Sequence, residues 1–240
     1  IIIAGANDGF LHGFNAGEYQ TGTQSYDPGT GVEVFGFMPW GARESIANLA
    51  KDDATLHPLN VDGSPAVSDV WFDSNADPND AKLASEWKTV LVTGMREGGE
   101  HLLALDITDP NSSGYPGYLW EFPIETDAVW RARIGQTWSQ PVITRVRLEQ
   151  TGGDIEEKWV AIAGFGYDAT SDPNDLAQYN ATSPKGRGIM MLDLETGSPI
   201  AVQRYGATTG TRSDMLYAFP SAPAVLDYDQ DGFADVIYIG

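Results

Sequence analysis

The sequence contains no cysteine and few basic residues. Without cysteine, a disulfide framework, a zinc ribbon and a thiol nucleophile are all excluded. Lysine and arginine number 14 against 34 aspartates and glutamates, which gives a formal net charge of −20. This charge disfavours nucleic acids and anionic membrane surfaces as partners, because basic patches supply the affinity for both. It favours the binding of cations.

Long apolar runs and long helical periodicity are also missing. No apolar stretch is long enough to span a membrane as a helix. Helical periodicity is confined to one short segment, residues 42–50. Elsewhere, short runs of β-branched and aromatic residues alternate with glycine and proline turn signals. This pattern predicts an all-β protein.

Four kinds of strand-like segment recur along the chain in a fixed order. The first begins with a small residue and a proline, the second ends in glycine, the third closes on a turn, and the fourth reads as an outer strand. Copies of the first lie at 63–67, 138–143 and 220–225, of the second at 1–5, 89–94, 159–164 and 236–240, of the third at 9–16, 101–108 and 188–197, and of the fourth at 118–122 and 200–205.

This order predicts a modified β-propeller with four-stranded blades, because blades bury their faces against their neighbours. The terminal glycines of the second strands fall at positions 5, 94, 164 and 240. These spacings exceed the usual blade length of about 40 to 50 residues, so long inter-strand insertions are expected, at 73–86, 149–157 and 168–185. Residues 1–240 then hold about three blade equivalents of a single β-propeller domain. Both ends fall inside strand-like runs, which predicts a fragment of a longer chain.

The most specific motif lies near the end of the sequence, where carboxylates occupy positions 1, 3, 5 and 9 of a loop with glycine at position 6. Carboxylates this close repel one another unless a cation lies among them, and calcium takes six to eight oxygen ligands. The loop therefore predicts a calcium site, and the alternative is a solvated acidic turn. Tyr238 replaces the glutamate of an EF-hand at position 12. The predicted ligands are Asp227, Asp229, Asp231, the backbone carbonyl of Phe233, and Asp235.

Other chemical signals are weaker. Residues 73–80 and 168–175 also alternate aspartate and asparagine, but they lack the loop glycine, so solvated loops are favoured over further ion sites. The three histidines, His12, His57 and His101, are scattered along the chain without a nucleophile nearby in sequence. The sequence therefore predicts no catalytic residues and no enzymatic activity.

Residues 3–16, 61–65, 87–94 and 104–110, together with the terminal acidic loop, resemble the C-terminal propeller of PilY-type proteins. These are bacterial type IV pilus assembly and tip-adhesin proteins, and the resemblance runs along the whole chain. It implies a modified β-propeller that is related in blade design to quinoprotein dehydrogenases but has no enzymatic role. It also implies calcium in the loop 227–235, with occupancy linked to the balance between pilus extension and retraction.

The resemblance further implies where the protein works. It implies an extracellular protein at the pilus tip on the bacterial surface, exported through the periplasm and acting in twitching motility and attachment. The implied partners are minor pilins and the pilus tip complex. Host-cell or surface receptors would be contacted through a variable N-terminal adhesive region that lies outside these residues.

Two other interpretations of the same residues stay open, a quinoprotein dehydrogenase and an integrin-like adhesion propeller. Residues 7–11 and 192–197 resemble the tryptophan-docking repeats of quinoprotein dehydrogenases, which bind their quinone and calcium on the propeller axis through separate blades. An integrin-like adhesion propeller would also carry calcium loops, but there the loop recurs from blade to blade. Here the segment expected at the equivalent place, residues 144–148, contains Arg145 and Arg147 and cannot bind a cation.

Overall fold

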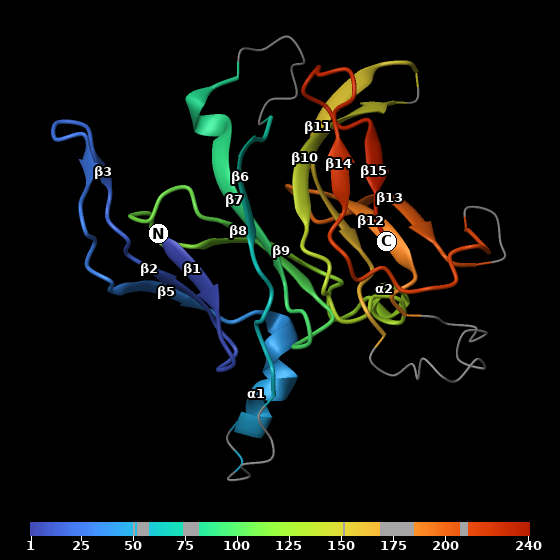
Figure 1. The fold of residues 1–240 in the computed structure, drawn as a ribbon, viewed down its shortest axis with the longest axis horizontal. Helices are drawn as coiled ribbons and strands as arrows, with labels where there is room; N and C mark the ends of the chain where they lie inside the picture. The colour runs from blue at the N-terminus through green and yellow to red at the C-terminus, as the bar shows by residue number, and fades with distance from the viewer. Residues whose placement is uncertain (50, 52–57, 74–81, 151, 169–184, 207–210) are drawn as a thin grey trace.

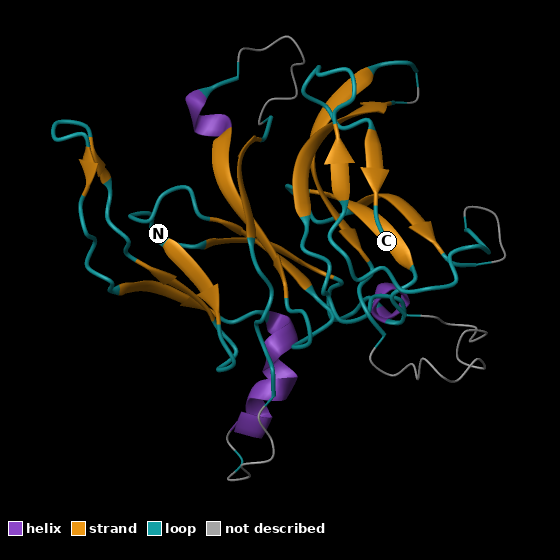
Figure 2. Cartoon of the chain, in the orientation of Figure 1, coloured by secondary structure: helices purple, strands orange, loops and turns teal. Residues whose placement is uncertain are grey.

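The structure is a computed structural model that describes residues 1–49, 51, 58–73, 82–150, 152–168, 185–206 and 211–240. The protein is all-β, with 43% strand and 7% helix. The three larger sheets lie side by side in chain order, from the N-terminal blue sheet through the green one to the yellow-to-orange one, and the short red sheet overlaps the last of these in this view (Figure 1). Figure 2 shows that strands make up most of the regular structure. Among the described residues, no helix is long and apolar enough to cross a membrane.

Two complete four-stranded antiparallel sheets occupy the middle of the chain. Blade B has the strand order β6-β7-β8-β9, and blade C has the order β10-β11-β12-β13. In both sheets each strand pairs with the next one along the chain, as the repeats predict. The strands of blade B are Ala66–Trp71, Trp87–Gly94, Leu102–Asp106 and Gly117–Phe122. Those of blade C are Val142–Glu149, Ile155–Gly164, Gly188–Asp193 and Pro199–Arg204.

Partial blades flank these two sheets. Blade A has the strand order β1-β2-β5, formed by Ile2–Gly5, Leu11–Phe14 and Glu33–Phe37. Blade D consists of β14 (Ala224–Leu226) and β15 (Val236–Tyr238). Blade A therefore supplies the second to fourth strands of a blade, and blade D the first and second. This arrangement confirms the predicted blade design and the estimate of about three blade equivalents.

Steric packing explains why glycine recurs at the ends of the second strands. Gly5, Gly94 and Gly164 lie against the backbone that leads into the next blade, so a side chain at these positions would clash with a carbonyl oxygen. A Cβ at Gly5, Gly94 or Gly164 would lie 2.2, 2.5 or 2.1 Å from the carbonyl oxygen of Val61, Thr137 or Phe219, respectively. The repeated glycine is thus the residue that allows neighbouring blades to approach closely.

Several insertions interrupt the blades. A hairpin of β3 (Tyr19–Gln20) and β4 (Ser25–Tyr26) precedes β5, and η2 (Ala84–Glu86) precedes β7. Between blades A and B lie η1 (Trp40–Ala42) and α1 (Arg43–Leu49), which confirm the expected short helix over its described residues. The helix α2 (Ala128–Arg131) links blades B and C.

One predicted insertion is wrong. Residues 149–157 are not a long loop, because β10 and β11 continue into them and Glu149 pairs with Ile155 across a short hairpin. The acidic residues that suggested a loop belong to these strands or to the short turn between them, where Glu149, Asp154 and Glu157 are exposed and Glu156 is half-buried. Most of the other two predicted insertions, at 74–81 and 169–184, lies outside the described residues.

Blades B and C are joined through Trp120 of β9. Its side chain is 4% exposed, and its Nε1 donates a hydrogen bond of 2.8 Å to the carbonyl oxygen of Leu194 in blade C. The indole covers Gly197, where a Cβ would lie 2.6 Å from the ring and where φ is +72°. A glycine is therefore required at this position both by the backbone conformation and by the packing. This contact lies in the segment 192–197 that the sequence identifies as a docking repeat.

The short helical insertion is held to blade B by a buried carboxylate. Glu121 of β9 is 6% exposed and accepts hydrogen bonds from the backbone N–H groups of Trp40 (2.8 Å) and Gly41 (3.3 Å). Burial raises the pKa of Glu121, and the two N–H donors act in the opposite direction. A negative charge suits these N–H groups, because the first turn of a helix leaves its donors without intrahelical partners.

His12 gives blade A a pH-dependent contact. Its Nδ1 lies 2.7 Å from Glu33 Oε1, and its Nε2 lies 3.1 Å from Asp8 Oδ2. The hydrogen bond to Glu33 is the main cause that raises the pKa of His12 above 6.5, while burial opposes it. A raised folded-state pKa means that the stabilisation is complete below the unfolded pKa and is lost as the pH rises through the folded pKa.

We therefore expect His12→Gln to destabilise the protein at low pH and to have little effect at high pH. The loss should be below about 1 kcal/mol, because the pair is partly solvated. Urea unfolding of both proteins between about pH 5.5 and 8.5 measures the difference. Glu33→Gln should flatten this pH dependence, and a difference that is independent of pH would contradict the assignment.

Candidate metal centre

The acidic loop lies in blade D, between β14 and β15. Its base is closed where Asp235 N donates a hydrogen bond of 2.9 Å to the carbonyl oxygen of Leu226. Inside the loop the chain turns sharply at Gln230 and Gly232, which have φ values of 62° and 89°. Glycine adopts this left-handed conformation without strain, so Gly232 serves the turn that the spacing predicts. The loop thus lies between the first and second strands of a blade, in agreement with the order of the repeats at 220–225 and 236–240.

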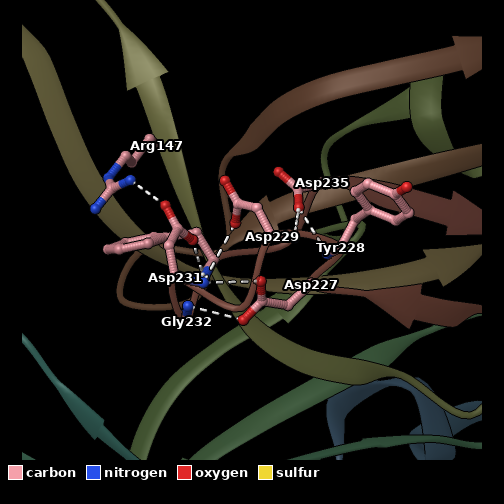
Figure 3. Close-up of polar contacts among 8 residues, drawn as sticks. Arg147, Asp227, Tyr228, Asp229, Asp231, Gly232 and Asp235 are labelled. Carbon is pink, nitrogen blue, oxygen red and sulfur yellow. Dashed lines mark hydrogen bonds and ion pairs between the residues drawn. The ribbon is translucent and has the colours of Figure 1, made fainter.

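Three of the loop carboxylates converge. One oxygen of each of Asp227, Asp229 and Asp235 lies within 4.8 Å of the other two, and all three residues are exposed (Figure 3). Carboxylate oxygens are the ligands that calcium prefers, and the ion tolerates an irregular arrangement of them. The donor set therefore fits a calcium ion. It is the one group with such spacing in the part of the chain that the structure describes.

Backbone N–H groups hold these carboxylates in place. Asp227 accepts hydrogen bonds from the N–H groups of Asp231 (3.1 Å) and Gly232 (2.7 Å). Asp235 accepts one from Tyr228 (2.7 Å), and Asp229 accepts one from Asp231 (3.2 Å). These donors fix the direction of each carboxylate and offset part of the mutual repulsion. Figure 3 shows the loop folded around its own acidic side chains.

Asp231 is not brought into this group. Its Oδ2 forms an ion pair with Arg147 of β10, and its Oδ1 accepts a hydrogen bond of 3.0 Å from Phe233 N. The side chain of Phe233 is buried beneath two guanidinium groups, whose carbons lie 4.6 Å (Arg145) and 3.9 Å (Arg147) from the ring centroid. Of the four predicted carboxylate ligands, the structure thus gathers three and turns the fourth to a neighbouring blade.

Arg145 and Arg147 were not predicted to contact the loop. Residues 144–148 are the middle of β10 rather than a loop, so the two arginines fall on the same face of a strand. Two like charges at alternate positions in so acidic a chain are the sequence signal for this contact. The weaker acidic stretches, 73–80 and 168–175, lie almost entirely outside the described residues.

Two complete antiparallel blades, two partial ones and a tryptophan docked between neighbours define a β-propeller-type domain that carries an acidic loop in one blade. The chain belongs to the PilY1 β-propeller domain family, whose model matches residues 1–240. This membership confirms the resemblance that the sequence motifs indicate.

Named relatives agree with this assignment. The chain is 29% identical over 241 residues to the type IV pilus biogenesis factor PilY1 of Pseudomonas aeruginosa strain PAO1, covering 100% of this chain and 16% of that protein. A PilY1 homolog of Xylella fastidiosa is 30% identical over 244 residues, covering 99% of this chain and 13% of the homolog. The crystal structure of the P. aeruginosa PilY1 C-terminal domain superposes with a TM-score of 0.55 at 26% identity, over 100% of this chain and 36% of that domain.

Proposed function

We propose that this chain is the calcium-binding part of a single β-propeller domain in a type IV pilus biogenesis protein. In this role it supports pilus extension, twitching motility and surface attachment. Family membership over the whole chain supports the pilus role, and the relatives are named as biogenesis factors rather than as enzymes. The observation that carries the calcium assignment is the convergence of Asp227, Asp229 and Asp235 between two strands of blade D.

The loop residues account for how calcium would act. A bound calcium ion would supply two positive charges to a group of carboxylates that otherwise repel one another. Asp227, Asp229 and Asp235 would hold the ion, while the N–H groups of Tyr228 and Gly232 keep Asp235 and Asp227 aimed at it. With the repulsion cancelled, the loop keeps one conformation, and so does the surface that it carries.

That surface is suited to a protein partner. On the loop itself, the side chain of Tyr228 is 84% exposed and offers an aromatic contact. Ordering of a loop by a cation is an established way to make such a surface competent. We propose minor pilins or other components of the pilus tip complex as the partners, and an extracellular location at the tip.

One feature of the structure agrees with the quinoprotein interpretation. Trp120 docked on Gly197 is the kind of contact that the docking repeats suggest. The contact concerns how blades pack and does not involve the acidic loop, whose converging ligands come from one blade. The structure therefore supports a calcium loop within one blade, as in the pilus interpretation. It gives less support to a site on the propeller axis built from several blades, as in the quinoprotein interpretation.

The cellular test uses Asp229→Asn, because Asp229 accepts the fewest hydrogen bonds within the converging group. Cells that produce this variant in place of the wild-type protein should show twitching that no longer responds to calcium. Twitching zones measured with and without a calcium chelator give the response. Asp214→Asn makes the same charge change in an exposed pair with Arg212, so it should behave as wild type. An Asp229 variant that stays as calcium-responsive as wild type would refute the proposal.

A further inference from the structure

Two arginines of blade C contact the acidic loop of blade D. Arg147 forms the ion pair with Asp231, and Arg145 and Arg147 both lie over the ring of Phe233. The main chain joins them as well, because Ala234 N donates a hydrogen bond of 2.8 Å to the carbonyl oxygen of Arg145. The loop is therefore attached to the neighbouring blade through three of its own residues.

Asp231 has two possible partners, the proposed calcium ion and Arg147. It lies two residues after Asp229, at the fifth position of a spacing in which alternate carboxylates can reach one ion. In the structure it points to Arg147, while Asp227, Asp229 and Asp235 converge without it (Figure 3). A cation that takes six to eight oxygens gains from a fourth carboxylate. In the structure Arg147 holds Oδ2 of Asp231 and the N–H group of Phe233 holds Oδ1, so binding of the ion through Oδ2 requires the release of Arg147.

We propose that Arg147 competes with calcium for Asp231 and so sets the calcium affinity of the loop. The inference rests on the proposed calcium site. When Asp231 turns to the ion, Arg147 loses its ion-pair partner in blade D, and occupancy of the loop changes the contact between blades C and D. Arg147 is thus a positioning residue that couples the site to the neighbouring blade.

A second acidic partner is available to Arg147 after release. Glu157 lies directly opposite it on β11, at a register position where opposite charges attract. Glu157 Oε2 is also 3.9 Å from Lys82 Nζ. Arg147, Glu157 and Lys82 all line a groove of about 820 Å³ between blades B and C, together with Trp71 and Trp159. Release of Arg147 would therefore let its guanidinium pair with Glu157 inside this groove.

The size of the effect follows from solvent exposure. The side chains of Arg147 and Asp231 are 44% and 32% exposed, so their ion pair is partly screened by water. Ion pairs of this kind shift an equilibrium by roughly two- to fivefold. The competition should therefore tune calcium affinity rather than abolish it.

Calorimetric titration of the full chain with calcium chloride tests the inference. Arg147→Gln should lower the dissociation constant by roughly two- to fivefold, and Arg147→Lys should restore most of the wild-type value. Lys158→Gln is the matched control. It removes the same charge from β11, where Lys158 pairs with Asp193 (3.0 Å) and Glu156 (3.1 Å) rather than with the loop. Its dissociation constant should stay at the wild-type value.

A double-mutant cycle separates competition from a general charge effect. In an Asp231→Asn background, Arg147→Gln should no longer tighten calcium binding, and an equal gain in both backgrounds would overturn the inference. Calcium should also shift the Arg147 Nε–H NMR signal in the wild type. If wild type and Arg147→Gln bind calcium equally well, the inference fails while the proposed site stands. If neither protein binds calcium, both fail.

Discussion

Replacing Asp235 by asparagine should weaken calcium binding by roughly a hundredfold, because the number of ligand charges sets the affinity of such loops over several orders of magnitude. The amide oxygen of asparagine can still accept the hydrogen bond from Tyr228 N, which is 2.7 Å long in the structure. The loop should therefore keep its shape while the site loses one of its three converging charges. Calorimetry with calcium chloride measures the affinity directly.

The control for this variant is Asp214→Asn, which removes the same charge from an exposed residue outside the loop. It should bind calcium as the wild type does, and both variants should unfold at the same urea concentration without calcium. Asp231→Asn should cause a smaller loss than Asp235→Asn, because Asp231 must break its ion pair with Arg147 before it can reach the ion. An Asp235 variant with wild-type affinity would exclude Asp235 as a ligand.

Replacing Trp120 by alanine should cause the largest loss of stability, about 3 to 5 kcal/mol. The indole is 4% exposed, fills the interface between blades B and C, and satisfies the carbonyl oxygen of Leu194. Its loss creates a cavity and leaves that carbonyl without its donor. Urea unfolding of the full chain, followed by circular dichroism, measures the change in the free energy of unfolding.

Two further variants show whether the blade contact is the cause. Gly197→Ala should destabilise the same interface from the other side, because its Cβ would lie 2.6 Å from the Trp120 ring. The two changes should not add, since they disrupt one contact. Trp87→Ala removes an indole that is 42% exposed and should cost only about 1 kcal/mol. A Trp120 variant no less stable than the Trp87 variant would contradict this role of the interface.

The repeats made the fold predictable, because each repeated residue is needed for the same local packing in every blade. The glycines that end the second strands must be glycine wherever one blade meets the backbone entering the next. The hairpin at 149–157 could not be predicted in the same way. Its acidic residues resemble a loop by composition, and only the pairing of β10 with β11 shows that strand continues on both sides of a short turn.

The sequence by itself determined that a sharply turning acidic loop lies between the first and second strands of a blade. It could do so because the spacing of the aspartates and Gly232 is a local property of the chain. Only the tertiary structure decided which carboxylates converge. Asp231 is turned away by Arg147, a residue 84 positions earlier that reaches the loop through the packing of blade C against blade D. Contacts between blades depend on how the sheets pack, and no local spacing encodes them.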